Sequence, residues 1–166
     1  MGEGVRVELR GGSLLMGEGV DLRPRCTLDL SGRLELKGAN VLQYGTTVHC
    51  DESVTVDRTA SMGEYTTLVD SSHTYDGPHE WFGHNVITAP IYIGENAWLG
   101  AKATVGRGVR IGERAVIGAN SMVVKDVPAG WLASGVPAQL VRDLAGTAGG
   151  DAVHLPGQFS RCRLPN

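Results

Sequence analysis

The sequence has few aromatic residues, little net charge and no long hydrophobic run. No apolar stretch is long enough to cross a membrane, and the N-terminal residues do not have the pattern of a signal peptide. The formal net charge of −3 argues against a surface that binds nucleic acid. Aromatic residues make up 5% of the 166 positions, whereas 24 positions are glycine. This composition favours a solenoid over a layered sandwich.

Cysteine is also scarce, with only Cys26, Cys50 and Cys162 in the chain. Three widely spaced cysteines predict neither a disulfide framework nor a zinc site. Free thiols are typical of a reducing compartment, so we expect a cytoplasmic protein.

A six-residue repeat runs from residue 93 to residue 128. Its first position is Ile, Leu or Val in all six units, its second is Gly in five, and its fifth is Ala, Val or Ser. Neither helical spacing nor strand alternation gives this period. A short fixed period is the signature of a β-solenoid. Three units would close a coil of eighteen residues, with the aliphatic and small residues inside and the glycines relieving crowding between coils.

The repeat extends upstream in a weaker form and out of phase. Aliphatic or small residues fall six apart at Leu30, Leu36, Leu42, Val48, Val54 and Ala60. The change of phase predicts an excursion at about residues 70–86, which holds three of the five histidines. We expect one β-helix domain over residues 1–144 and a Gly-rich tail over residues 145–166.

Three blocks carry a resemblance to a known family. They are residues 92–101 (YIGENAWLGA), 117–128 (IGANSMVVKDVP) and 135–142 (GVPAQLVR). In this order and spacing they resemble the hexapeptide-repeat acetyltransferases, in particular the galactoside, maltose and nodulation-factor O-acetyltransferase branch. The resemblance implies an all-β fold, a left-handed parallel β-helix, assembled as a homotrimer. It also implies an acetyl-CoA site in each cleft between neighbouring subunits.

The same resemblance implies residues that contact the acyl donor. The backbone of Ala101 and Ala119 would hydrogen-bond the pantetheine arm, and Val124 and Lys125 would provide the next contact. Two further positions would address the adenosine phosphates, and they are occupied by Gln139 and Arg142. An arginine is common in the family where this chain has Gln139, whereas Arg142 keeps the charge suited to phosphate.

The catalytic base of the family lies in the excursion, and His73 matches its position. A histidine suits proton transfer near neutral pH. Counting thirty residues back from His73 reaches Gln43, where the galactoside branch has an acceptor-binding asparagine. Trp98 would line the cleft near the acyl group or be buried at the trimer contact. Trp81 and His84 are further candidates for contact with the acceptor.

These features predict an enzyme that transfers an acetyl group from acetyl-CoA to a hydroxyl of a sugar or another small molecule, with an amine as a possible acceptor. His73 would deprotonate the acceptor, which attacks the thioester directly, and no metal would be needed. One alternative is a zinc-dependent hydratase of the γ-carbonic-anhydrase type, using His73, His79 and His84. Another is a non-catalytic β-helix scaffold. We expect neither nucleic acid nor a membrane as a partner.

Overall fold

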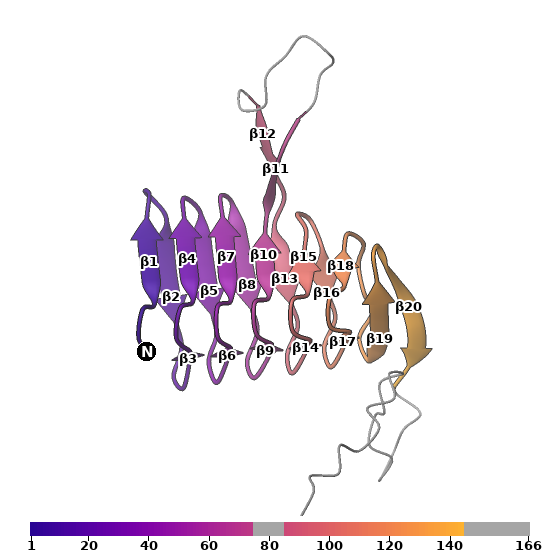
Figure 1. Cartoon of the computed structure of the whole chain (residues 1–166). Helices are drawn as coiled ribbons and strands as arrows, with labels where there is room; N and C mark the ends of the chain where they lie inside the picture. Colours follow the sequence, from indigo (N-terminus) through magenta and orange to yellow (C-terminus); the bar gives the residue numbers. More distant parts are fainter. Residues whose placement is uncertain (75–84, 145–166) are drawn as a thin grey trace, which may run out of the picture.

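The computed structural model of the chain describes residues 1–74 and 85–144, which form a three-sided prism of parallel β-strands (Figure 1). The chain passes repeatedly from face A to face B to face C and back to face A. This arrangement confirms the expected parallel β-helix. The described residues form no helix, so none of them belongs to a helix able to cross a bilayer.

Face A has six strands and face B has five. The strands of face A are β1 (Arg6–Leu9), β4 (Thr27–Leu30), β7 (Thr47–Cys50), β10 (Thr67–Val69), β15 (Thr104–Val105) and β18 (Met122–Val123). The strands of face B are β2 (Ser13–Met16), β5 (Arg33–Leu36), β8 (Ser53–Val56), β13 (Ile91–Ile93) and β16 (Arg110–Ile111).

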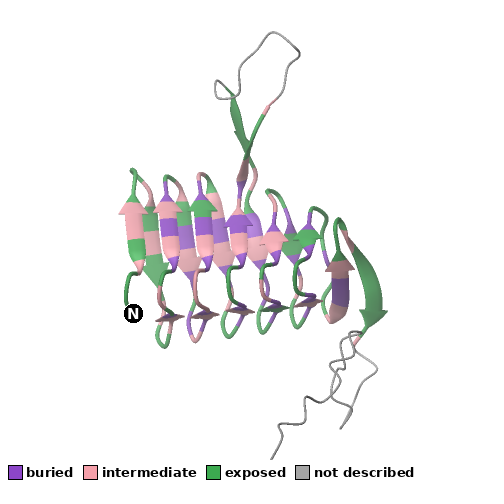
Figure 2. Cartoon of the chain, in the orientation of Figure 1, coloured by how far each residue is buried: buried purple, intermediate pink, exposed green. Residues whose placement is uncertain are grey.

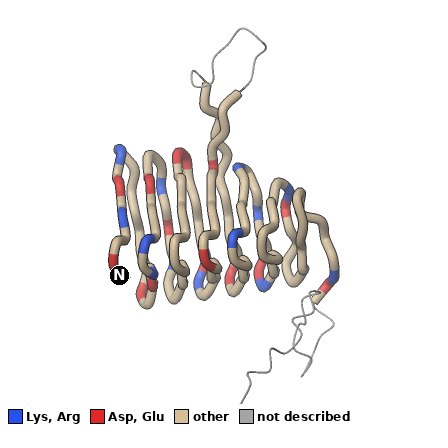
Figure 3. Tube along the Cα trace, viewed as in Figure 1, with Lys and Arg blue, Asp and Glu red and all other residues tan. Residues whose placement is uncertain are grey.

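Face C ends in an antiparallel strand. Its members are β3 (Asp21–Leu22), β6 (Val41–Leu42), β9 (Ser61–Met62), β14 (Trp98–Leu99), β17 (Val116–Ile117), β19 (Trp131–Gly135) and β20 (Ala138–Asp143). β20 folds back along β19 and closes the C-terminal end of this face. Charges of both signs are interspersed along the coils (Figure 3).

The two halves of the prism have coils of different length. In the second half paired residues are 18 apart, as Trp98 is with Val116, which confirms the six-residue repeat. In the first half most are 20 apart, as Thr27 is with Thr47, and the paired residues of β1 and β4 are 21 apart. The upstream interpretation of six-residue units was therefore wrong. In the first half, the strands of faces A and B have four residues, and each strand places two of them inside the prism. Each coil therefore has two residues more than the 18-residue coils of the second half.

The core is a set of columns of stacked aliphatic residues, one from each coil. Figure 2 shows buried residues on the strands of successive coils. Under face A the column consists of Leu28, Val48, Leu68, Val105 and Val123, each at most 1% exposed. Under face C it consists of Leu22, Leu42, Met62, Leu99, Ile117 and Ala133. The small fifth residues of the hexads, such as Ala97 and Ala103, also point inside and are buried.

Most of the second-position glycines, all but Gly106, are required by the close approach of neighbouring coils. A Cβ on Gly100 would lie 2.6 Å from the backbone nitrogen of Ala119, and one on Gly112 would lie 2.3 Å from that of Ala129. Left-handed backbone angles occur instead at the fourth hexad position, as at Asn96 and Lys102. Crowding, rather than an unusual φ, therefore explains these glycines.

The chain leaves the prism after β10 and returns at β13, where the change of phase predicts an excursion. Its base is an antiparallel ribbon of β11 (Ser71–His73) and β12 (Val86–Thr88). Figure 1 shows the ribbon projecting from the edge where face A meets face B. The predicted domain boundary at residue 144 coincides with the limit of the described residues and stays a prediction.

Alanine should be tolerated at one repeat glycine and not at another. Gly100→Ala should lower the free energy of unfolding by about 3 kcal/mol, because the methyl group would overlap backbone atoms of the next coil. Gly106→Ala is the matched control, since its Cβ would meet nothing closer than 3.5 Å, and it should change stability by less than about 1 kcal/mol. Urea unfolding of the two variants measures the difference. Equal stabilities would show that the coils can separate to admit a methyl group.

Candidate functional site

His73 stands on the projecting ribbon and is exposed to solvent. It is the last residue of β11 and pairs with Val86 of β12. Just beyond it the Thr74 backbone N–H donates to the Asn85 carbonyl oxygen over 3.0 Å. Within the described part of the chain, no hydrogen bond to the His73 imidazole is found.

A buried carboxylate fixes the base of the ribbon. Asp70 is fully buried and accepts backbone N–H groups from Asp51, Glu52 and Ser53 over 2.7, 2.9 and 2.7 Å. Its carbonyl oxygen also accepts the N–H of Ala89, where the chain returns to the prism, over 2.9 Å. Asp70 thus ties both legs of the excursion to the preceding coil.

The buried thiol beside this carboxylate is kept protonated. Burial and the neighbouring charge of Asp70 raise the pKa of Cys50 to about 12. Burial likewise raises the pKa of Cys26. A thiol reacts as its thiolate, so neither of these cysteines is a nucleophile near neutral pH.

Two of the predicted CoA contacts are equivalent residues on the edge where face C turns into face A, the C–A edge. The carbonyl oxygen of Ala101 accepts the N–H of Asn120, the residue after Ala119, over 2.9 Å. The backbone N–H groups of Ala101 and Ala119 themselves find no acceptor in the part of the chain described here. Their side chains are small, and coil spacing sets the two groups about 4.8 Å apart. Two such donors can bind the amide carbonyls of an extended ligand.

Gln139 lies farther along the same edge. It pairs with Ser134 of β19, and the space beside the Gly118 backbone is filled by Ser134, whose Oγ would lie 2.6 Å from a Cβ there. Arg142 is three residues on, opposite Leu132, and is exposed. Gln139 therefore continues the line of Ala101 and Ala119, whereas Arg142 lies farther back on face C, in line with Val116.

The other two predicted CoA contacts lie on a different edge. Val124 and Lys125 follow β18 and occupy the edge where face A turns into face B, the A–B edge, which also carries the ribbon. Both are exposed. In one chain they are thus nearer to the base of the ribbon than to Ala101 and Ala119.

Face A separates the two edges within one chain. The segment from Thr66 to Asp70 crosses this face, and at about 3.3 Å per residue it spans roughly 13 Å. The ribbon with His73 then extends away from the prism (Figure 1). Within one chain the ribbon and the C–A edge therefore lie on opposite sides of face A.

The predicted acceptor residues are only partly described. Gln43 lies on the C–A edge, at the position that Gly100 and Gly118 occupy in later coils. Trp98 points outward from face C, three residues before Ala101, and is 46% exposed. Trp81, His84 and His79 lie outside the described residues.

Two exposed cations near these edges were missed by the sequence analysis. Lys102 follows Ala101, and its left-handed φ of 60° fixes it at the corner. Arg107 lies on the A–B edge, one coil beyond the ribbon and one coil before Lys125. Their positions in the outward-facing third and fourth places of the hexads were the available signal.

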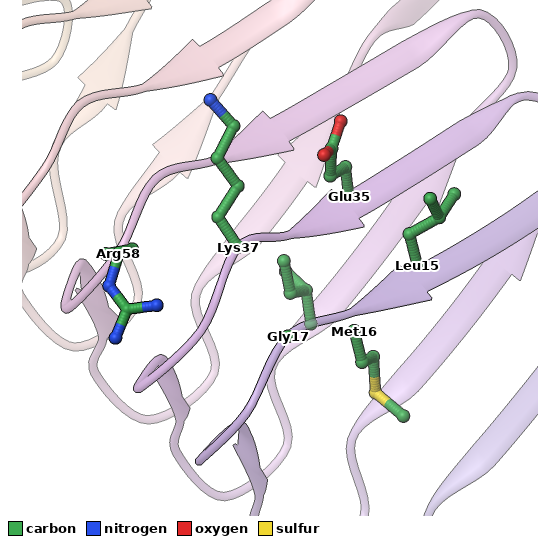
Figure 4. Close-up of a pocket in the computed structure, with 7 residues that line it drawn as sticks. Leu15, Met16, Gly17, Glu35, Lys37 and Arg58 are labelled. Atoms are coloured by element: carbon green, nitrogen blue, oxygen red, sulfur yellow. The ribbon is translucent and has the colours of Figure 1, made fainter.

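Two other features lie apart from the predicted residues. Within residues 1–74 and 85–144 no three His, Cys, Asp or Glu side chains cluster as metal ligands. A shallow depression of about 450 Å³ lies on face B at the N-terminal end (Figure 4). It is lined by Leu15, Met16, Gly17, Glu35, Leu36, Lys37 and Arg58.

Comparison with known proteins agrees with the fold and the repeats. Residues 90–125 match the family model of the bacterial transferase hexapeptide, six repeats. The galactoside O-acetyltransferase of Escherichia coli K12 is 28% identical over 129 residues, which cover 78% of this chain and 63% of that protein. That of Lactococcus lactis is 40% identical over 97 residues, covering 47% of each. This chain thus spans less than two thirds of either relative.

A solved structure is similar over most of the chain. It is a hexapeptide-repeat acetyltransferase of Vibrio cholerae in complex with acetyl-coenzyme A, with a TM-score of 0.67 and 25% identity. The match covers 81% of this chain and 71% of that one. A three-faced prism with these hexads defines the class of hexapeptide-repeat proteins. In its repeats and in its fold the chain is similar to hexapeptide-repeat acetyltransferases.

Neutralising Asp70 should destabilise the base of the ribbon. In Asp70→Asn an amide NH₂ replaces one oxygen and faces backbone donors, so we expect a loss of about 2–3 kcal/mol in the free energy of unfolding. Glu52→Gln, an exposed carboxylate on the same edge, should change it by less than about 0.5 kcal/mol. Urea unfolding measures both. If the free energy of unfolding of Asp70→Asn equals that of the wild type, the three hydrogen bonds do not hold the ribbon.

Proposed function

We propose that the protein is an acetyl-CoA-dependent acetyltransferase that modifies a hydroxyl of a sugar or another small molecule. The observation that carries this proposal is the pair of open N–H groups at Ala101 and Ala119, on the corners where the family resemblance expects the pantetheine arm. The similarity to galactoside O-acetyltransferases and to a structure solved with acetyl-coenzyme A supports the same reaction.

The active site is proposed to form between subunits of a homotrimer. One subunit supplies His73 from its ribbon, and its neighbour supplies the C–A edge with Ala101, Ala119 and Gln139. The roughly 13 Å between the two edges of one chain supports this division. Lys125 and Arg142, exposed on their own elements, are the cations offered to the phosphates of CoA.

In the reaction, the His73 imidazole accepts the proton of the acceptor hydroxyl while the hydroxyl oxygen attacks the thioester carbonyl carbon. Backbone N–H groups of the neighbouring edge stabilise the oxyanion of the tetrahedral intermediate. When the intermediate collapses, the carbon–sulfur bond breaks, and the imidazolium returns its proton to the leaving thiolate. The products are the acetyl ester and free CoA.

Removing the proposed base should slow turnover without weakening donor binding. His73→Ala should lower kcat by about 10²–10⁴-fold, while the dissociation constant for acetyl-CoA stays within about twofold. Release of CoA thiol with a panel of sugar acceptors measures kcat, and calorimetry measures binding. His49→Ala, which removes an exposed histidine on face A, is the control and should retain full activity. Full activity of His73→Ala would exclude this residue as the base.

A mixing experiment tests whether the site is shared between subunits. Ala119→Trp should block the C–A edge, so this variant and His73→Ala should each be inactive alone. When the two variants are co-expressed, each mixed trimer contains only one site with both edges intact, and activity should return to about a quarter to a third of wild type. No recovery in verified mixed trimers would place both halves of the site in one chain.

A further inference from the structure

The C–A edge continues toward the N-terminus beyond Ala101, and its side chains there are aromatic and cationic. The ring centroids of Tyr44 and Tyr65, from successive corners, are 5.5 Å apart in an edge-to-face arrangement. The guanidinium of Arg25, one corner earlier, lies 5.4 Å from the centroid of the Tyr44 ring. The three side chains form a continuous ladder along the edge, the Arg25–Tyr44–Tyr65 ladder.

The Tyr65 ring is held outside the prism by the left-handed backbone that also occurs at Lys102, the equivalent position of the next coil. Its φ is 57°, in the left-handed region that is uncommon for a bulky residue, and its side chain leaves the residue 51% exposed. The ring occupies the space above Gly45, where a Cβ would lie 2.6 Å from it. Glycine at position 45 thus makes room for an exposed ring that contributes little to the core.

Aromatic residues are concentrated at this edge although the chain has few of them. The described residues contain five, namely Tyr44, Tyr65, Tyr92, Trp98 and Trp131. Two form the ladder, and Trp98 precedes Ala101 by three residues on the adjoining face. Rigid exposed rings of this kind provide flat apolar surfaces with polar groups at their margins, which suit the face of a sugar ring.

Polar groups that have no ionic or hydrogen-bond partner among residues 1–74 and 85–144 flank the rings. Neither Arg25 nor Lys102 forms an ion pair with another described residue. The backbone N–H groups of Tyr44 and Glu64, equivalent to those of Ala101 and Ala119, also find no acceptor there. An unpaired arginine with open N–H groups nearby is suited to a phosphate.

The direction of the donor places the ladder on the acceptor side. If Ala101 and Ala119 hold the pantetheine and Arg142 holds the phosphates, the thioester points toward the N-terminal coils. Gln43, the predicted acceptor residue, lies in those coils beside Tyr44. From Ala101 to Arg25 the edge covers three coil spacings, roughly 14 Å.

We propose that the Arg25–Tyr44–Tyr65 ladder is the acceptor subsite and that the acceptor is a glycosyl phosphate. The sugar ring stacks on Tyr65, the Glu64 carboxylate and the Gln43 amide meet its hydroxyls, and Arg25 binds the phosphate. This inference rests on the proposed acetyltransferase function. Glycosyl phosphates occur as simple sugar phosphates and as nucleotide sugars, and only the nucleotide sugars carry a further phosphate and a nucleoside.

Binding measurements with matched ligands test the subsite. Galactose, glucose and N-acetylglucosamine would each be measured as the methyl glycoside, the 1-phosphate and the uridine-diphosphate sugar, by saturation-transfer NMR and calorimetry in the presence of CoA. At least one phosphorylated form should bind at least tenfold more tightly than its methyl glycoside. Tighter binding of the nucleotide form than of the 1-phosphate would identify a nucleotide sugar as the acceptor.

Variants with matched controls locate the binding. Tyr65→Gly removes the ring at a φ that glycine accepts, and it should weaken phosphorylated ligands by at least tenfold. Arg25→Ala should weaken the binding of the phosphorylated ligands and leave the binding of the methyl glycosides unchanged. Thr59→Gly and Arg58→Ala, a left-handed residue and a cation on the edge between faces B and C, should change nothing.

The outcomes distinguish a failure of this inference from a failure of the proposed acetyltransferase function. Wild-type affinity in Tyr65→Gly, or no binding of any phosphorylated form, would overturn the ladder as an acceptor subsite. Equal binding of charged and uncharged forms, with no effect of Arg25→Ala, would show that the subsite does not recognise a phosphate. CoA binding should persist in every variant, and its absence from the wild-type protein would instead contradict the proposed function.

Discussion

Backbone hydrogen bonds join successive coils at the corners as well as along the strands. At the C–A edge the N–H of one corner donates to the carbonyl of the previous corner, as Tyr65 does to Tyr44 over 2.9 Å and Lys102 to Glu64 over 2.7 Å. The coils therefore stack in strict register. This register decides where glycine is obligatory, which residues meet in the core, and how side chains align along an edge.

The same register makes each edge of the prism a row of chemically similar positions. In the described corners of the C–A edge that contain Tyr44, Glu64, Ala101 and Ala119, this one residue leaves its N–H group outside the ladder of hydrogen bonds. Its side chain decides whether a ligand can reach that group. Alanine at 101 and 119 opens the row, whereas Glu95 and Glu113 occupy the equivalent positions on the edge between faces B and C. Binding selectivity along this fold therefore depends on a few side chains at fixed intervals.

The second half of the fold could be predicted from the sequence, and much of the first half could not. Regular glycines and aliphatic residues from Ile93 onward mark the hexads directly. Upstream, Leu30 and Leu36 both point inside, but they stack on Cys50 and Val56, twenty residues later. Inward residues also recur at a spacing of two within each four-residue strand, so spacing alone did not reveal the coil length.

The candidate site residues could be named from the family resemblance, but their distribution over the edges required the structure. The hexad pattern shows which side chains point outward. It does not show that the ribbon and Ala101 lie on opposite sides of face A. The tyrosine ladder left no signal in the repeat, because Tyr44 and Tyr65 occupy different positions of their corners and meet only through Gly45.

The interruption of the solenoid also bears on how the chain folds. Most paired strands join residues 18 to 20 positions apart, but β10 pairs with β15 across 37 positions, as Thr67 does with Thr104. Because the entropy of loop closure grows only with the logarithm of length, this longer connection costs about 0.5 kcal/mol more than a regular coil. Coil-by-coil propagation, the expected route for a repeat protein, would thus be little delayed at the insertion. A solenoid can accept a functional insertion at a corner with a small effect on the assembly of its neighbours.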